Sequence, residues 1–336
     1  MTRYYRPLVQ TDPARPGAAQ TLAGGWAWFT HLEVLTRGAP ARIIAADAAP
    51  SDVLARLTAS RAPIAGLAMT RPQIMGILNL TPDSFSDGGT FNAPDAALAR
   101  GHAMVQTGSD ILDFGGESTR PGATEVAIAD EIARTAPVIA ALRAAGLSAP
   151  ISIDTRKSAV AAAALDAGAN LINDVSGLDF DPKMAALAAN RRVPICLMHA
   201  QGPPETMQHD PQYGDVVLDV YDALAERIAR AEAAGIARAQ IIVDPGIGFG
   251  KTQTHNLALL ARISVFHGLG CPILLGASRK RFIGTIGNAP EAVDRGPGSA
   301  AIGLHALAQG VQLLRVHDIE LHKQAIALWQ AATGKA

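Results

Sequence analysis

The sequence predicts an α/β fold, a (β/α)8 TIM barrel with an N-terminal extension. Eight short apolar segments alternate with helix-like runs from residue 74 onward, and nearly every apolar segment ends in a polar or glycine-containing cluster. Strand, helix and strand in repeated order indicate a parallel sheet, and such a barrel places its reactive groups in the loops after its strands. A doubly wound open sheet is the structural alternative, but the eight units with polar endings favour the barrel.

The expected strands are residues 74–78, 111–114, 151–153, 171–172, 194–198, 241–243, 272–275 and 313–314. Alanine-rich segments with leucine, isoleucine and valine at helical spacing predict the helices between them. These segments lie near residues 125–145, 156–168, 215–235 and 298–310. Gly146, Gly168 and Gly235 fall where three of these helices should end, since glycine tolerates the positive φ common at that position.

The first part of the chain lacks this alternation. Residues 1–70 are assigned to an N-terminal extension of uncertain structure, and residues 71–336 to the barrel domain. Prolines near the start indicate irregular backbone there. Short apolar stretches at 34–35, 43–44 and 64–65 are candidate strands that pack on the barrel. No function is assigned to this region.

Composition limits the class of protein. The net charge is −1, so no general electrostatic attraction to nucleic acid or anionic lipid is expected. Cys196 and Cys271 lie in apolar segments, which predicts buried thiols rather than a disulfide. No uncharged apolar run reaches the roughly 18 residues of a membrane span, and no secretory signal is visible. We therefore expect a soluble cytoplasmic protein with neither nucleic acid nor membrane as a partner.

Three polar residues at separate strand ends form the strongest candidate site. Asp154, Asn173 and Asp244 each follow a segment that looks buried, where a carboxylate is costly unless something pairs with it. Together they suit a flat heterocycle with several N–H donors along one edge, such as a guanine-like or pterin-like ring. Helix N-caps are the alternative, since Asp and Asn often take that role. Three such residues at three strand ends favour ligand binding.

Two long polar clusters follow the first two expected strands. Residues 79–89 begin with Asn79, whose amide oxygen suits a hard cation such as Mg2+. Residues 115–122 combine flexible glycines with Arg120, a residue type suited to carboxylate or phosphate. Solvated surface loops are the alternative for both clusters, although loops of this length in a compact domain are usually functional or mobile.

A glycine-rich run follows the sixth expected strand. Residues 244–251 lack the spacing of a nucleotide-binding P-loop, because Gly246 is only four residues before Gly250. The glycines are expected to let the backbone pass under a flat ring, with Phe249 beside it. His199 has no second histidine or paired cysteine nearby, so no zinc site is expected there.

Cationic residues follow the last two expected strands, where these barrels commonly bind phosphate. Arg279, Lys280 and Arg281 come after the seventh strand. Arg315 and His317 alternate along the eighth and are expected to point to one side. Single cations of this kind are most often solvated, but their placement after buried strands favours an anion site.

Taken together, these motifs resemble those of the dihydropteroate synthases. The resemblance covers about residues 73–320 and keeps the order of that family's motifs. The matching segments are 79–89 (NLTPDSFSDGG), 115–122 (GGESTRPG), 153–155 (IDT), 172–175 (INDV), 197–199 (LMH), 244–246 (DPG), 278–280 (SRK) and 315–318 (RVHD).

The resemblance implies a transferase, transferring an alkyl group other than methyl. Its reaction would join 7,8-dihydropterin-6-ylmethyl diphosphate to 4-aminobenzoate, giving 7,8-dihydropteroate for folate biosynthesis and diphosphate. By similarity, the pterin-binding residues are Asp154, Asn173, Asp244, Lys280 and Arg315. The implied catalytic residues among them are Asp154, Lys280 and Arg315, to which His317 is added.

The same resemblance implies places for the other ligands. Asn79, Arg315 and His317 would hold the diphosphate, with Mg2+ as cofactor and Asn79 as its ligand. The residues implied for the 4-aminobenzoate side and its loops are Thr119, Arg120, Pro121, Ser278, Phe85 and Phe249. A homodimer is expected from the family.

Two other functions are compatible with part of the pattern. A pterin-binding methyltransferase of the same superfamily would use the carboxylates and the amide, but it has no need of the cations at Lys280, Arg315 and His317. A catalytically silent pterin-binding homologue is the alternative from outside the enzymes, and the intact polar set argues against it.

Overall fold

The computed structural model describes residues 2–80, 93–118, 122–202 and 206–334. Its centre is an eight-stranded parallel sheet in the order β11-β10-β9-β8-β7-β6-β13-β12, closed by a parallel bridge between Val243 and Ile273. The strands are β6 (Gln73–Asn79), β7 (Ile111–Gly115), β8 (Ile151–Asp154), β9 (Leu171–Asp174), β10 (Ile195–Met198), β11 (Ile241–Asp244), β12 (Leu274–Leu275) and β13 (Leu313–Val316). The predicted barrel is confirmed, and the open-sheet alternative is wrong.

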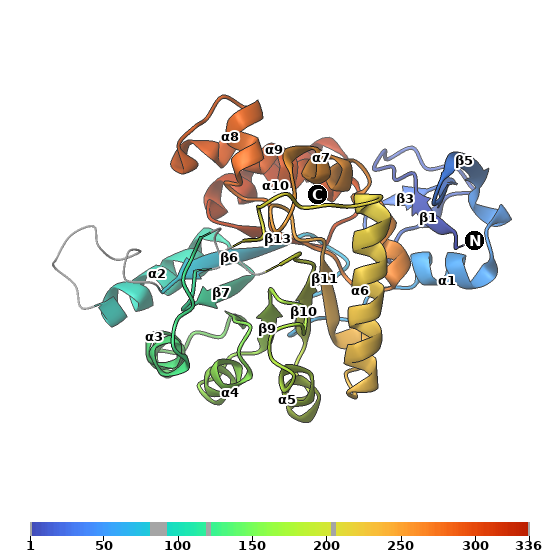
Figure 1. Ribbon diagram of the computed structural model, residues 1–336. Coiled ribbons are helices and arrows are strands. Elements are labelled where there is room, and N and C mark those ends of the chain that lie inside the picture. The colour runs from blue at the N-terminus through green and yellow to red at the C-terminus, as the bar shows by residue number, and fades with distance from the viewer. Residues whose placement is uncertain (1, 81–92, 119–121, 203–205, 335–336) are drawn as a thin grey trace.

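Helices surround the strands (Figure 1). They are α2 (Ala93–Thr107), α3 (Ile128–Ala144), α4 (Ser158–Asp166), α5 (Met184–Arg191), α6 (Val216–Ala233), α7 (Gln253–Ala261), α8 (Arg281–Ile286), α9 (Gly296–Ala308) and α10 (Ile319–Ala332), with 3-10 turns η3 (Arg238–Gln240), η4 (Ile263–Leu269) and η5 (Ala292–Arg295). Gly146, Gly168 and Gly235 follow three of these helices with φ of 83°, 112° and 99°. The predicted helix ends are therefore confirmed.

Alternation along the strands sorts the side chains into two cores. Leu112, Phe114 and Ile153 point outward and pack under the helices in the larger core. Their neighbours in sequence, such as Ile111 on β7, point inward and fill the amino-terminal end of the barrel. The polar residues at the carboxyl ends of the strands lie above this inner layer. Cys196 and Cys271 are free and buried, as predicted.

The extension folds into a small unit beside α6 and η4 (Figure 1). It contains an antiparallel sheet, a short hairpin and one helix: β1 (Tyr4–Pro7), β4 (His31–Thr36), β5 (Ala39–Ala45), β2 (Gln20–Thr21), β3 (Trp28–Phe29), η1 (Ala46–Ala48) and α1 (Ser51–Thr58). Tyr4 donates to Asp222 of α6 at 2.8 Å, and Arg37 pairs with Asp219 and Asp222. The candidate strands at 34–35 and 43–44 lie in β4 and β5, whereas Ile64 forms only an isolated bridge with Leu67.

The last residues of the extension complete the inner core of the barrel. Ile64 and Met69, at the end of the extension, pack against the first residues of the barrel strands.

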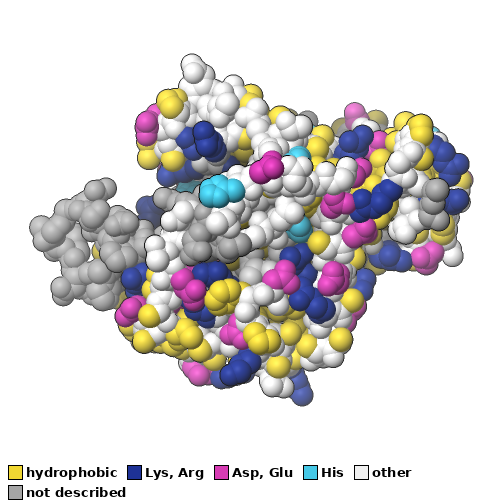
Figure 2. All heavy atoms as spheres, viewed as in Figure 1, with side chains coloured by type: hydrophobic (Ala, Val, Ile, Leu, Met, Phe, Trp, Pro, Cys, Tyr) yellow, Lys and Arg dark blue, Asp and Glu magenta, His cyan; other side chains and the backbone are white. Residues whose placement is uncertain are grey.

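Within the described residues, no helix is both long and apolar enough to cross a membrane. On the face seen in Figure 2, basic and acidic side chains are interspersed rather than gathered into a patch of one sign.

Candidate active site

The structure brings together the three predicted strand-end residues. Asp154 on β8 pairs in register with Asn173 on β9, and Asp244 ends β11. All three are nearly fully buried, with exposed fractions of 6%, 3% and 5%. The N-caps of α4, α5 and α7 are Lys157, Lys183 and Thr252. The strand-end residues therefore cap no helix, and the helix-cap alternative is wrong.

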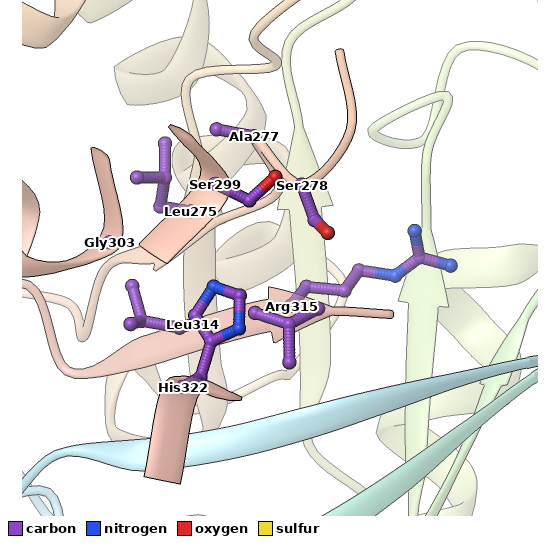
Figure 3. Close-up of a pocket in the computed structure, with 9 residues that line it drawn as sticks. Leu275, Ala277, Ser278, Ser299, Gly303, Leu314, Arg315 and His322 are labelled. Atoms are coloured by element: carbon purple, nitrogen blue, oxygen red, sulfur yellow. The ribbon is translucent and has the colours of Figure 1, made fainter. Parts of the chain in front are cut away.

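Arg315 joins two buried carboxylates inside the barrel. Its Nε donates to Asp113 Oδ2 and its Nη2 to Asp154 Oδ2, each at 2.6 Å. Asn173 Nδ2 donates to the same oxygen of Asp113 at 3.2 Å. Figure 3 shows Arg315 extending from β13 toward the neighbouring strands. Four strands thus contribute to one hydrogen-bonded cluster.

Asp113 is a site residue that the sequence analysis missed. It lies in the middle of β7 and is fully buried, so it does not belong to the polar cluster after the strand. A signal was present, because a carboxylate within an apolar strand is costly unless it is paired. Asp113 and Gly115 point to the same side of the strand, into the barrel. A Cβ at Gly115 would lie 3.7 Å from Asn79 Oδ1 and from Asp154 Cβ, so this glycine lies among the polar side chains of the site.

Two carboxylate oxygens of this cluster are left unpaired among the described residues. Oδ1 of Asp113 and Oδ1 of Asp154 have no hydrogen-bond partner within the described part of the chain. Burial raises the pKa of Asp154 to about 7, and Asp113 adds to this effect although Arg315 opposes it. Burial also raises the pKa of Asp244 to about 6, against the N–H of Gly246 and the charge of Lys280. Such a site suits a ligand that offers several N–H donors.

Lys280 lies at the edge of this cluster, on the side of Asp244. Its Nζ is 4.0 Å from the centre of the Phe249 ring, in a cation–π contact. Gly248 has φ of +80°, and a Cβ there would lie 3.2 Å from Lys280 Cδ, so glycine lets the loop pass close to the lysine stem. Phe249, expected beside a flat ring, therefore lies beside the ammonium group of Lys280.

Ser278 and His317 connect the loops after β12 and β13. The backbone N–H of His317 donates to Ser278 Oγ at 3.2 Å, and His317 Nδ1 lies 3.1 Å from the same oxygen. Behind them is a small hollow of about 10 Å³, with Ser299, Gly303 and His322 among its lining residues (Figure 3). It has room for roughly one water molecule, so it is not a substrate pocket.

One expectation about the cations is wrong. Arg279 does not join Lys280 in an anion site, because its guanidinium pairs with Asp318, with Nε 3.0 Å from Oδ2. The backbone at Arg279 is left-handed, with φ of 58°, which turns this side chain away from that of Lys280. Arg281 is exposed at the start of α8. Of the three cations in this run, Lys280 is therefore the one whose charge acts on the buried Asp244.

Of the remaining predicted residues, Asn79 lies at the site, His199 is buried, and four others lie outside the described residues. Asn79 ends β6, and its Oδ1 lies 3.7 Å from the position a Cβ would take at Gly115, which Asp154 also contacts. His199 is buried, and burial together with Lys251 lowers its pKa to about 2. Phe85, Thr119, Arg120 and Pro121 lie outside the described residues.

A second buried charge cluster, also missed, lies beside the first. Lys157 Nζ hydrogen-bonds to Glu117 and lies 2.9 Å from Glu131 Oε2. Thr155 Oγ1 donates to Glu131 Oε1, and Arg156 Nε donates to Glu117 Oε1. Glu117, Glu131 and Lys157 are 7%, 1% and 2% exposed. The cluster joins the start of the loop after β7 to the residues that follow Asp154.

Among the described residues, the closed barrel thus combines buried carboxylate oxygens without partners and cations at one end, as is typical of an enzyme active site. The family model described as "Pterin binding enzyme" matches residues 75–317. The chain is 46% identical over 264 residues to the dihydropteroate synthase of Synechocystis sp., covering 77% of this chain and 91% of that protein. It is 44% identical over 265 residues to the Escherichia coli dihydropteroate synthase, covering 79% and 93%.

Solved structures agree with these relatives. The Xanthomonas albilineans dihydropteroate synthase with 4-aminobenzoic acid matches with a TM-score of 0.76 and 46% identity, covering 81% of this chain and 97% of that one. The chain belongs to the pterin-binding enzyme family. Its function is that of a dihydropteroate synthase, a transferase.

Proposed function

We propose that the acceptor cluster of Asp113, Asp154, Asn173 and Asp244 binds the pterin of 7,8-dihydropterin-6-ylmethyl diphosphate, which is condensed with 4-aminobenzoate to give 7,8-dihydropteroate and diphosphate. The two buried carboxylate oxygens that find no partner in the described part of the chain carry this proposal, because a pterin edge supplies the N–H donors they lack. A similar solved structure, from Xanthomonas albilineans, is described as a complex with 7,8-dihydropteroate.

In the proposed reaction the C–O bond to diphosphate breaks with its electron pair leaving on oxygen. The amine lone pair of 4-aminobenzoate forms the new C–N bond, and the amine then loses a proton. Positive charge develops on the pterin methylene, where the carboxylate of Asp154 stabilises it without rearrangement. Lys280 hydrogen-bonds the pterin, Arg315 stacks on its face, and Arg315 and His317 contact the departing diphosphate.

The donor set at Asn79 fits a metal that arrives with the substrate. One neutral amide oxygen faces the site near Asp154, and the described residues contain no group of three His, Cys, Asp or Glu side chains arranged to hold an ion. Mg2+ is commonly bound by few protein oxygens together with substrate phosphates. Asn79 would thus hold Mg2+ bound to the diphosphate, where it would neutralise charge on the leaving group.

Two further parts of the proposal concern the setting of the enzyme. We infer a homodimer, as expected for the family, and a cytoplasmic location, in keeping with buried free cysteines. Neither affects the chemistry derived above.

The direct test is turnover by purified full-length protein with Mg2+ and both substrates. We expect equal amounts of dihydropteroate and diphosphate, measured by chromatography and by a coupled phosphate assay. Binding of the pterin without diphosphate release would instead identify a silent homologue. Methyl transfer from methyltetrahydrofolate, with no dihydropteroate formed, would identify the methyltransferase.

A further inference from the structure

The lysine of the glycine-rich run after β11 has no part in the chemistry above, although it is deeply buried. Lys251 is 3% exposed. Its Nζ lies 2.9 Å from both Gly246 O and Phe249 O, and 3.1 Å from His199 O. The same atom is 2.9 Å from His199 Nδ1. Three carbonyl oxygens and one imidazole nitrogen therefore surround the Lys251 amine, which points back into its own loop.

The backbone of this loop needs such a donor. Gly246, Gly248 and Gly250 have φ of 68°, 80° and 62°, so the loop is neither helix nor strand and its carbonyls turn inward. A Cβ at Gly246 would lie 1.9 Å from His199 O, which shows how closely the loop packs on the end of β10. Buried carbonyls without partners are costly. Lys251 gives the Phe249 carbonyl its donor, and it gives the Gly246 carbonyl a second donor beside the Phe249 N–H at 3.1 Å.

The loop in turn supports Lys280. The Phe249 carbonyl is held by Lys251, and the Phe249 ring lies under the ammonium of Lys280 at 4.0 Å. The Lys280 stem passes beside Gly248. Gln208 Nε2 also donates to Gly248 O at 2.6 Å, which adds a second attachment from the loop after β10. A continuous path of contacts therefore runs from Lys251 through Phe249 to Lys280.

We propose that Lys251 is a positioning residue for Lys280: by holding the carbonyls of Gly246 and Phe249, it fixes the aromatic surface on which the Lys280 ammonium rests. This inference rests on the proposed role of Lys280 in binding the pterin. It assigns the lysine of the run to internal support, whereas the lysine of a P-loop contacts phosphate directly. Loss of Lys251 would release the Phe249 backbone and, with it, the ring on which the Lys280 ammonium rests.

A double-mutant cycle tests this chain of contacts. The Kd of 7,8-dihydropterin-6-ylmethyl diphosphate is measured by calorimetry for wild type, Lys251→Met, Lys280→Met and the double variant. We expect Lys251→Met to raise Kd roughly tenfold in the wild-type background, as for loss of one hydrogen bond to a charged group. The same change should raise Kd by less than about twofold when Lys280 is already absent, because contacting residues are not additive.

Two results would overturn the inference. One is an unchanged Kd for Lys251→Met, and the other is an equal fold-change in both backgrounds, which would indicate a general structural role. Lys183→Met is the matched control, because Lys183 is exposed just before α5; its Kd should equal that of wild type.

A second variant covers the case in which Lys251→Met fails to fold. Phe249→Leu keeps the lysine but removes the ring, and it should raise the pterin Kd without additivity with Lys280→Met. Additive effects of Phe249→Leu and Lys280→Met would contradict the path of contacts. Turnover by the wild-type protein distinguishes failure of the proposed function from failure of this inference. An inactive wild type contradicts the proposed function. An active wild type with additive variants contradicts only the role of Lys251.

Discussion

Two buried charge clusters at the ends of β7 and β8 differ in how completely their charges are paired. In the first, Asp113 and Asp154 share Arg315, and each keeps one oxygen without a partner among the described residues. In the second, both oxygens of Glu117 and both of Glu131 accept hydrogen bonds, from Lys157 and its neighbours. The first cluster is incomplete without a ligand, whereas the second is complete as it stands.

This difference separates binding from support. Carboxylates with unpaired oxygens and raised pKa values are typical of functional sites. A fully paired cluster is instead a rigid connection, here between the loop after β7 and the turn after Asp154.

The largest effect is expected from Lys157→Met. It leaves Glu117 and Glu131 buried without their shared cation, and breaking a buried ion pair costs roughly 3–5 kcal/mol. The free energy of unfolding, measured by urea denaturation, should fall by that amount. Glu125→Gln is the control, because this carboxylate is 51% exposed and 3.9 Å from Lys157, and it should change stability by less than about 0.5 kcal/mol. Equal effects of the two variants would contradict the contrast.

Asp154→Asn should strongly lower turnover. Loss of the carboxylate removes charge stabilisation at the pterin methylene, and we expect kcat to fall by roughly 10²–10³. The acid limb of the wild-type pH profile of kcat/KM should lie near the Asp154 pKa of about 7, and the variant should lack it. A variant with wild-type kcat would exclude Asp154 from the chemistry.

The same variant makes a prediction for stability against pH. Because folding raises the Asp154 pKa from 3.8 to about 7, the neutral carboxyl favours the folded state below pH 4, and this advantage is lost as pH rises to 7. Asp154→Asn should therefore lose less thermal stability between pH 5 and pH 8 than wild type. A steeper loss in the variant would show that Arg315 lowers the pKa of Asp154 by more than burial raises it.

The smallest effect is expected from Asn79→Ala. If Asn79 ligates Mg2+ together with the diphosphate, the Mg2+ concentration for half-maximal rate should rise roughly tenfold, the lower end of the range for weakened metal sites. Titration of Mg2+ at saturating substrates measures this change. An unaltered half-maximal concentration would remove Asn79 from the metal site.

Much of the fold and half of the polar site could be predicted because barrels repeat a simple pattern. Asp154, Asn173 and Asp244 each end a recognisable strand, and strand ends converge in a closed barrel. Asp113 was missed because it lies inside a strand, where only the alternation of side chains reveals that it faces the same cavity. The extension could not be predicted in detail because its strands are short and follow no repeated order.

Other features depend on contacts between distant parts of the chain. Arg279 and Lys280 are adjacent in sequence, and nothing in their order showed that Asp318 would pair with the first of them. Glu117 and Lys157 are likewise separated by 40 residues. Lys251 was recognised as part of a glycine-rich run, but its direction depends on the left-handed backbone of that run.

The packing of Ile64 and Met69 has a practical consequence for work on this enzyme. Both residues precede residue 75, where the family match begins, so a shortened protein designed from family boundaries would omit them. Their removal would expose to water the apolar side chains at the amino-terminal end of the barrel, which are Met75, Ile111, Leu171 and Leu313. The segment before residue 75 therefore completes the inner core of the barrel. Removing it would lower the stability of the domain that the shortened protein is meant to contain.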